Sequence, residues 1–280
     1  MARKIVKRYV SALTIAGSDS SGGAGIQADL KTFSAFGIYG ASVITAITAQ
    51  NTSGVNAIEK VSGYMVREQI DAVFNDLTID VLKTGMLPGV DIIEIVAEAI
   101  DRYHPPYVIV DPVLEASSRD QLVDAKVSEA YRRCLYPRLT LLTPNVPEAA
   151  VLAGMEIKST RDIEQAGDVL IRQGCRAVLI KGGHAFTVGT IDTLFRSFQS
   201  TLYYSGPRLR TRNTHGTGCT LSAAIASCLA SELTLEDSVE QAKEYMTAAI
   251  RHGGEIQTGW GNGPVSHFFS PRIALMREIY

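Results

Sequence analysis

Short apolar runs alternate with amphipathic segments along nearly the whole chain, and this alternation constrains the fold more than any other feature. The first run, Val10–Ala16, has the length and composition of a buried strand. A loop of glycines and hydroxyl side chains, Gly17–Gly25, follows it. Apolar side chains then recur at helical spacing, at Ile26, Leu30 and Phe33. Strand, loop and helix in this order predict a βα unit whose loop lies at the carboxyl end of the strand, where open α/β sheets bind their ligands.

The same order recurs along the rest of the sequence. Further strands are predicted at Ser42–Ala49, Ile79–Lys83, Tyr107–Val110, Leu139–Leu142 and Ala177–Ile180. Helices are predicted at Val66–Leu77, Ile92–Ile100, Ala125–Tyr131, Arg161–Gln173 and Val239–Ile250. Residues Ile191–Tyr204 break the alternation with two strands about a short turn, as expected of antiparallel edge strands. We therefore predict a three-layer α/β/α sandwich with a mostly parallel central sheet and antiparallel edge strands.

Composition is typical of a water-soluble globular protein. The 280 residues are 46% hydrophobic and 20% charged, and they contain no internal repeat, low-complexity segment or linker. We expect a single domain over residues 1–280. The net charge of −2 gives no electrostatic reason to expect nucleic acid or an anionic membrane as a partner.

Targeting and cysteine patterns favour the cytoplasm. The basic first residues are not followed by a signal-type apolar stretch, and no run of about 18 apolar residues could span a bilayer. The cysteines are widely spaced and form no CxxC pair: Cys134, Cys175, Cys219 and Cys228. This spacing argues against a zinc site or a disulfide framework.

The stretch Asn213–Thr220 contains a glycine turn that leads into an apolar helical run, Leu221–Ala226. Gly216 and Gly218 allow backbone conformations that a side chain would forbid. Free amide groups and the positive dipole end of the predicted helix make this turn a candidate anion site. The same field favours the thiolate of Cys219. The alternative, equally weighted on this stretch alone, is a structural loop with a buried cysteine.

Polar or glycine-rich residues follow most of the predicted strands, so they are expected at one edge of the sheet: Gly17–Gly25, Gln50, Met86, Asp111, Asn145 and Lys181. Any one of them is explained by the polarity of loops, but their convergence indicates a site. The sequence has no Walker A motif and no GxGxxG fingerprint, because Gly22–Gly25 matches the latter only in part.

Six stretches together resemble the ribokinase-like superfamily: Ala12–Phe33, Ala49–Thr52, Lys83–Leu87, Thr143–Ala149, Lys181–His184 and Asn213–Ala224. Within that superfamily the chain is similar to the hydroxymethylpyrimidine and phosphomethylpyrimidine kinases of thiamine synthesis. The resemblance covers nearly the whole chain. Related bacterial pyridoxal kinases share most of these stretches, so the substrate needs a separate argument.

In these kinases MgATP donates its γ-phosphoryl group to a primary hydroxyl of a small heterocycle. The resemblance implies nucleotide contacts from Asn145, Lys181, Thr214, Gly216, Thr217 and Gly218. It implies catalytic roles for Cys219, Gly216, Gly218 and Lys181. Most ribokinase-like enzymes have an aspartate as general base at the position of Cys219. The thiol suits that role if its pKa falls from about 8.5 towards neutrality, and a buried inert thiol is the alternative.

Metal binding is implied for Glu148 and Asp111, with Mg²⁺ held through water. Asn145 and Glu148 also have the spacing of a helix capping box, and both roles could hold at once. A turn-initiating aspartate and a solvated strand-end lysine are the alternatives for Asp111 and Lys181. The sequence leaves a monovalent cation requirement open.

The resemblance places the acceptor pocket at Gly17, Ala24, Asp29, Gln50, Met86 and Val113. Gln50 is the most informative of these, because its amide offers one donor and one acceptor to the ring nitrogen and amino group of an aminopyrimidine. Asp29 is expected to accept a hydrogen bond from the substrate, and Met86 and Val113 to sandwich the flat ring. Related pyridoxal kinases tend to carry methionine at the position of Gln50.

The leading hypothesis is therefore an ATP- and Mg²⁺-dependent kinase that phosphorylates 4-amino-5-hydroxymethyl-2-methylpyrimidine and then its monophosphate. A pyridoxal or pyridoxine kinase is the second hypothesis, and a non-catalytic pyrimidine-binding protein is the third. By analogy with the family, we expect a homodimer that acts on a small molecule.

Overall fold

Nine strands form the central sheet of the computed structural model, which describes residues 6–114, 121–182 and 189–279. In chain order these strands are β2 (Ser11–Asp19), β3 (Tyr39–Asn51), β4 (Gly54–Lys60), β5 (Val81–Thr84), β6 (Tyr107–Val110), β7 (Leu141–Leu142), β8 (Ala177–Lys181), β9 (Thr190–Arg196) and β10 (Leu202–Gly206). Their order across the sheet is β10-β9-β8-β7-β6-β5-β2-β3-β4. The strands from β8 to β3 run parallel, whereas β4, β9 and β10 pair antiparallel with their neighbours.

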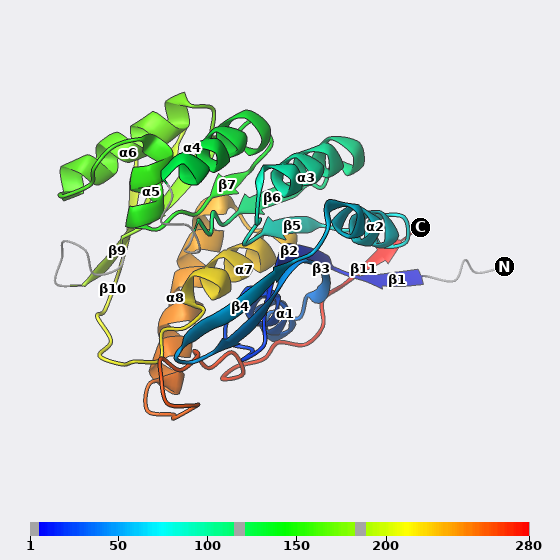
Figure 1. Cartoon of the computed structure of the whole chain (residues 1–280). Helices are drawn as coiled ribbons and strands as arrows, with labels where there is room; N and C mark the ends of the chain where they lie inside the picture. The colour runs from blue at the N-terminus through cyan, green and yellow to red at the C-terminus, as the bar shows by residue number, and fades with distance from the viewer. Residues whose placement is uncertain (1–5, 115–120, 183–188, 280) are drawn as a thin grey trace.

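Helices cover both faces of this sheet (Figure 1). One layer contains α2 (Gly63–Phe74), α3 (Val90–Tyr103), α4 (Gln121–Ala130), a π-helical turn η1 (Tyr131–Leu135), α5 (Val146–Ala153) and α6 (Thr160–Arg172). The other layer contains α1 (Gly25–Ala35), α7 (Thr217–Ala230) and α8 (Leu235–Gly253). Within the described ranges, no helix is long and apolar enough to cross a membrane.

The predicted three-layer sandwich is confirmed, including the antiparallel edge formed by β9 and β10. The differences concern the ends of two predicted elements and the strands that were not predicted. The strand predicted at Leu139–Leu142 is reduced to β7, and the helix predicted to end at Tyr131 continues into η1. Strand β4 is one of the unpredicted strands, because its residues are exposed and so carry no burial pattern.

Helix α7 is buried around nearly its whole circumference, from Thr220 to Ala230. A helix buried on all sides must lack long polar side chains, and α7 is made of small residues, chiefly alanine, serine and cysteine. It packs against the sheet and between α1 and α8. This packing fixes its N-terminus at the carboxyl edge of the parallel strands.

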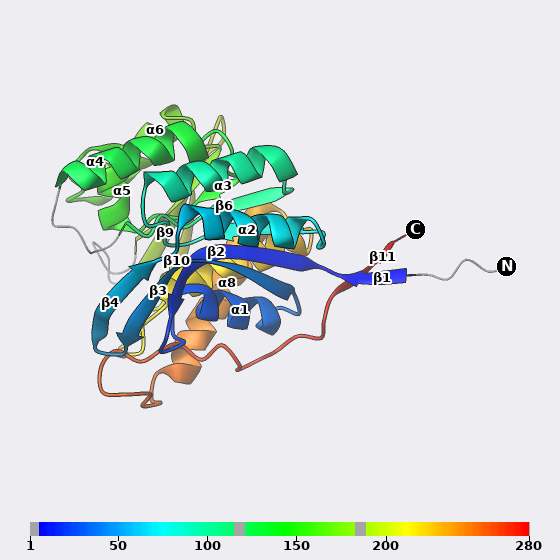
Figure 2. The same ribbon diagram turned by 45° about the vertical axis from the view of Figure 1, so that its right-hand side comes forward.

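The two ends of the described chain pair with each other at the end of the molecule away from the carboxyl edge of the parallel strands (Figure 2). Strand β1 (Val6–Tyr9) lies antiparallel to β11 (Met276–Ile279). The buried carboxylate of Asp80 joins both strands to the sheet, since it accepts hydrogen bonds from Arg8 at 2.7 Å and from Arg277 at 2.8 Å. It also accepts one from the backbone amide of Ser11 at 2.9 Å.

We predict that Asp80→Asn lowers the free energy of unfolding by about 1–3 kcal/mol at pH 7, because the arginines lose their charged partner. Burial alone would raise the pKa of Asp80, but hydrogen bonds from Arg8 and Ser11 lower it below its usual 3.8. The charge therefore stabilises the fold above pH 3.8 and loses its effect as the pH falls through the lowered pKa.

Urea denaturation of the wild type and Asp80→Asn between pH 3 and pH 8 checks this. The exposed Asp168, replaced by asparagine, is the matched control. Equal stabilities of the two variants at pH 7 would contradict the prediction.

Candidate active site

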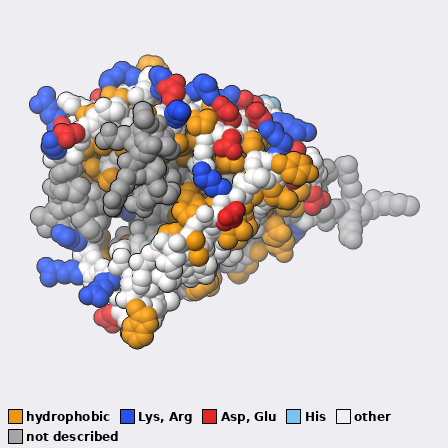
Figure 3. All heavy atoms as spheres, in the orientation of Figure 1, with side chains coloured by type: hydrophobic (Ala, Val, Ile, Leu, Met, Phe, Trp, Pro, Cys, Tyr) orange, Lys and Arg blue, Asp and Glu red, His pale blue; other side chains and the backbone are white. Residues whose placement is uncertain are grey.

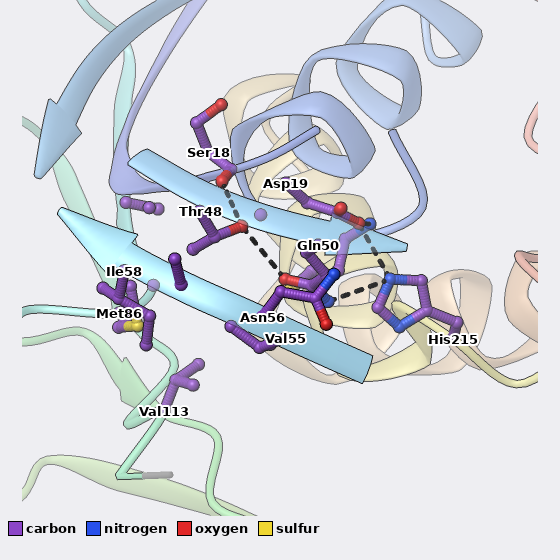
Figure 4. A pocket seen from close by; sticks show the side chains of 17 residues that line it. Ser18, Asp19, Thr48, Gln50, Val55, Asn56, Ile58, Met86, Val113 and His215 are labelled. Atoms are coloured by element: carbon purple, nitrogen blue, oxygen red, sulfur yellow. Dashed lines mark hydrogen bonds and ion pairs between the residues drawn. The ribbon is translucent and has the colours of Figure 1, made fainter. Parts of the chain in front are cut away.

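A cavity of about 570 Å³ opens at the carboxyl edge of the sheet, between the end of β2, the β3–β4 hairpin, the end of β5 and the start of α7. Five of the six residues predicted for the acceptor pocket line it: Gly17, Ala24, Gln50, Met86 and Val113. Figure 4 shows an apolar side at Ile58, Met86 and Val113, opposite a polar side at Thr48, Gln50 and His215. A flat ring with polar substituents on one edge matches this division.

Gly17 is required by the close approach of Met86. A Cβ atom at position 17 would lie 2.6 Å from the Met86 methyl group, which lines the cavity. The register of β2 and β3 also shifts between Ala16 and Gly17. The strand thus ends in a local irregularity that opens its last residues to the cavity.

Asp29 does not lie at the cavity, which corrects the predicted substrate contact. It is fully buried, and its carboxylate accepts hydrogen bonds from Lys83 at 2.8 and 2.9 Å and from Thr14 at 2.6 Å. Burial alone would lower the pKa of Lys83, but the charge of Asp29 raises it. The two residues form a buried ion pair behind the site.

A second cavity, of about 410 Å³, lies on the other side of the glycine turn. Its lining includes five residues predicted to bind the nucleotide: Asn145, Lys181, Thr214, Thr217 and Gly218. Between the two lies a third space of about 470 Å³, bordered by Gln50, Glu148, His215 and Gly216. The glycine turn therefore lies between the acceptor cavity and the cavity predicted for the nucleotide, and the third space connects them, as a site for group transfer requires.

The turn is held by contact between two glycine backbones. Gly216 has φ +78° at the N-terminus of α7, and a methyl group there would overlap the carbonyl oxygen of Gly23. The first turn of α7 thus lies directly against the glycine loop after β2 (Figure 1). Its free amide groups make the end of α7 suitable for an anion.

Lys181 reaches the turn from the end of β8. A Cβ atom on Gly218 would lie 3.3 Å from its Nζ atom. Its ammonium group donates to Asp111 at 2.7 Å, and burial, which lowers the pKa of Lys181, is outweighed by this carboxylate, which raises it. Lys181 thus carries its positive charge beside the candidate anion site.

Asp111 is a buried carboxylate that orients Lys181. It is buried and accepts hydrogen bonds from Lys181, from Thr143 at 2.9 Å and from Ser222 at 3.1 Å. Although burial would raise it, the lysines hold the pKa of Asp111 below its usual value. These contacts orient the Asp111 carboxylate between Lys181 and the first turns of α7.

The capping box at the start of α5 is confirmed. The Glu148 amide donates to the Asn145 side chain at 2.8 Å, and the Asn145 amide donates to the Glu148 carboxylate at 2.7 Å. Both residues also border the space beside Gly216. The structural role is therefore compatible with a role near phosphate and metal.

The environment of Cys219 differs from the expectation. Burial raises the pKa of its thiol to about 11, Lys83 lowers it, and the carboxylates of Asp29 and Asp111 raise it further. Desolvation and negative charge thus outweigh the helix terminus. Cys219 nevertheless lines the acceptor cavity, beside the turn.

Two site residues were not singled out by the sequence analysis. Asp19 ends β2, and its carboxylate accepts from His215 at 2.8 Å and from the amides of Ser21, Gly23 and Ala24. An aspartate before Ser-Ser-Gly-Gly is the sequence signal for such a turn. His215 lay within the quoted motif, but its partner is 196 positions away. Gly183 and His184, also quoted for the resemblance, lie outside the described residues.

We predict that Gly216→Ala lowers kcat/KM at least 100-fold, because the methyl group must displace the turn from Gly23 and misplace the phosphate donors. Gly154→Ala is the matched control: its φ is also positive, at +65°, but a Cβ atom there meets nothing within 4 Å. Steady-state kinetics and thermal melts of both variants check this. Equal losses of activity in the two variants would contradict it.

Comparison with known proteins gives a consistent result. The family model described as phosphomethylpyrimidine kinase matches residues 19–266. The hydroxymethylpyrimidine/phosphomethylpyrimidine kinase of Salmonella typhimurium is 46% identical over 260 residues, covering 92% of this chain and 97% of that protein. A thiamine biosynthesis bifunctional protein of Geobacter sulfurreducens is 45% identical over 93% of this chain and 52% of its own length.

Solved structures are similar throughout the fold. Bacillus subtilis pyridoxal kinase, in an ADP complex, has a TM-score of 0.86 at 36% identity, covering 93% of this chain and 98% of that one. A phosphomethylpyrimidine kinase from Clostridium difficile has a TM-score of 0.74 at 40% identity, covering 85% and 100%. The chain belongs to the phosphomethylpyrimidine kinase family and has its ribokinase-like fold.

Proposed function

We propose that this chain transfers the γ-phosphoryl group of ATP to 4-amino-5-hydroxymethyl-2-methylpyrimidine, and then to the resulting monophosphate, in thiamine diphosphate synthesis. The observation that carries the proposal is the acceptor cavity, in which Gln50 faces an apolar side of Met86 and Val113. The names of the relatives at 45–46% identity support the same reaction.

The nucleotide belongs in the cavity beside α8, with its phosphates at the Gly216–Gly218 turn. Lys181 supplies positive charge there, and the amides of the turn stabilise the charge of the phosphoryl group during transfer. Thr214, Thr217 and Asn145 border the same space.

Mg²⁺ would be bound here by the phosphates of the nucleotide together with a protein carboxylate. Mg²⁺ usually keeps several waters and takes one or two carboxylates together with substrate phosphates. Glu148 is a suitable carboxylate on the phosphate side, since it borders the space next to Gly216. Asp111 contributes through Lys181, which it orients. Within the described residues, no group of three or more His, Cys, Asp or Glu side chains forms a ready-made metal site.

A pyridoxal kinase activity is the second candidate. Its support is the TM-score of 0.86 to the Bacillus subtilis pyridoxal kinase, which shows that the two chains share their architecture closely. Gln50 favours the pyrimidine, because an amide pairs a donor and an acceptor with the ring nitrogen and amino group. Pyridoxal is therefore proposed as a side substrate at most.

We also propose a single domain, a homodimer and a cytoplasmic location. One sheet that runs from residues 11 to 206 and two continuous cores support the single domain. The outer face of the β3–β4 hairpin supports self-association, since Ile47 is 55% exposed there. A requirement for a monovalent cation stays an open expectation of the family resemblance.

A coupled ADP-release assay with hydroxymethylpyrimidine, its monophosphate and pyridoxal in parallel tests the function. We expect turnover of both pyrimidines, with kcat/KM for hydroxymethylpyrimidine at least tenfold above that for pyridoxal, about 1.4 kcal/mol in transition-state binding. Turnover of pyridoxal alone would establish the second candidate, and no turnover of any acceptor would refute the enzyme.

We predict that Cys219→Ala lowers kcat about 10²–10⁴-fold while it leaves the KM for ATP nearly unchanged, as expected for loss of a general base. Because the pKa of the thiol is raised to about 11, its thiolate fraction grows as the pH rises towards that value. The wild-type kcat should therefore increase from pH 6 to pH 9, and the variant should lose this increase. Unchanged kcat in the variant would exclude the thiol as the base.

A further inference from the structure

Five residues form a continuous chain of polar contacts along one wall of the acceptor cavity (Figure 4). His215 Nε2 lies 2.8 Å from Asp19 Oδ2 and 3.3 Å from Gln50 Nε2. Gln50 Oε1 lies 3.2 Å from Thr48 Oγ1, which lies 2.8 Å from the carbonyl oxygen of Ser18. The order is therefore Asp19, His215, Gln50, Thr48 and Ser18. The hydrogen-bonding protons of His215 and Thr48 decide whether Gln50 must donate or accept on each side.

At one end of the chain of contacts, the Asp19 carboxylate accepts a hydrogen bond from each of its partners other than His215. The carboxylate receives the amide and hydroxyl of Ser21 at 2.8 Å each, and the amides of Gly23 and Ala24 at 3.0 and 2.8 Å. Burial would raise the pKa of Asp19, but these hydrogen bonds and that of His215 lower it, so the group is ionised and can only accept. His215 Nε2 must therefore carry a proton and donate it to Asp19. Its single N–H is then directed at Asp19, so Nε2 has no lone pair with which to accept from Gln50 at 3.3 Å and can share only a weaker branch of that N–H with an acceptor there.

At the other end, Thr48 has one hydroxyl proton. The carbonyl oxygen of Ser18 takes it, because it lies at 2.8 Å, nearer than the Gln50 oxygen at 3.2 Å. Thr48 Oγ1 can therefore only accept a hydrogen bond from its other neighbour, Gln50. Thus the His215 side of Gln50 cannot receive a hydrogen bond from the amide nitrogen and suits the amide oxygen, whereas the Thr48 side requires a donor.

The backbone of Gln50 is already fixed. Ser20 Oγ donates to the Gln50 carbonyl at 2.7 Å and accepts from the Gln50 amide at 2.9 Å. The freedom that matters is a half-turn of the side-chain amide, which exchanges its nitrogen and oxygen at nearly the same positions. The amide as it stands in the structure has its nitrogen beside the protonated Nε2 of His215 and its oxygen beside the Thr48 hydroxyl, whose proton goes to Ser18, so both contacts are mismatched. The exchanged orientation pairs both.

We propose that His215, held by Asp19, and Thr48, held by Ser18, are positioning residues that fix the Gln50 amide with its oxygen towards His215 and its nitrogen towards Thr48. One N–H and one oxygen lone pair of the amide then remain for the substrate. With the aminopyrimidine of the proposed function, on which this part rests, the amino group lies on the His215 side of the amide. The acceptor ring nitrogen lies on the Thr48 side. Because the Gln50 amide is held in this orientation before the substrate binds, binding loses less side-chain entropy.

The amide orientation is tested first without any substrate. In protein labelled with ¹⁵N-glutamine, the side-chain peak of Gln50 is identified by its loss in Gln50→Met. We expect nuclear Overhauser effects from its amide protons to the Thr48 side chain to be stronger than those to the ring of His215. Stronger effects to His215 would overturn the proposal.

The effect on recognition is tested with Thr48→Val, which keeps the shape and removes the acceptor oxygen. We expect the KM for hydroxymethylpyrimidine to rise about tenfold, with kcat within about twofold and the KM for ATP unchanged. Thr48→Ser, which restores the hydroxyl, should return most of the affinity. Thr32→Val is the matched control, since Thr32 is also a buried threonine, on α1 and outside the cavity, whose hydroxyl donates to the Ala28 carbonyl.

A merely structural role of Thr48 would give a different result. Thr48→Val would then change kcat and the KM for ATP as much as the KM for the pyrimidine, and Thr48→Ser would not rescue it, which would overturn the proposal. Failure of the proposed function is distinguishable, because absence of pyrimidine turnover in the wild type leaves the amide orientation measurable in the free protein. The expected Overhauser effects would then still support the positioning by His215 and Thr48.

Discussion

The contact between the backbones of Gly216 and Gly23 is the constraint on which the site depends. A side chain on Gly216 would overlap the Gly23 carbonyl and separate the end of α7 from the loop after β2, and a side chain on Gly23 would meet the ring of His215. Helix α7 can come this close because its small residues let it lie within the core rather than on its surface. The phosphate end and the acceptor end of the site are therefore held together by main-chain packing, which is stiffer than side-chain contact.

The central part of the fold could be predicted because its signals are local. Strand β6 has the predicted bounds, Tyr107–Val110, since a parallel strand buried on both faces appears as an uninterrupted apolar run. The edges lacked such signals. Strand β4 is exposed along its length, and the pairing of β1 with β11 joins segments at opposite ends of the sequence. Neither follows from periodicity.

The site residues that belong to family motifs could be predicted from the sequence. The position of a residue was harder to predict where a contact with a residue far along the chain determines it. Gln50 and Met86 line the cavity as expected, but Asp29 does not, because Lys83, 54 positions away, pairs with it in the core. For Cys219 the sequence showed the helix terminus that favours a thiolate. It could not show the burial and the two carboxylates that oppose it.

The pairing of β1 with β11 places both described ends of the chain at one corner, next to the amino end of β2 (Figure 2). The acceptor cavity lies at the carboxyl end of that same strand. Any segment joined to either terminal strand is therefore attached a full strand length away from the cavity mouth. Substrate entry and attachment of a further segment thus use opposite ends of β2.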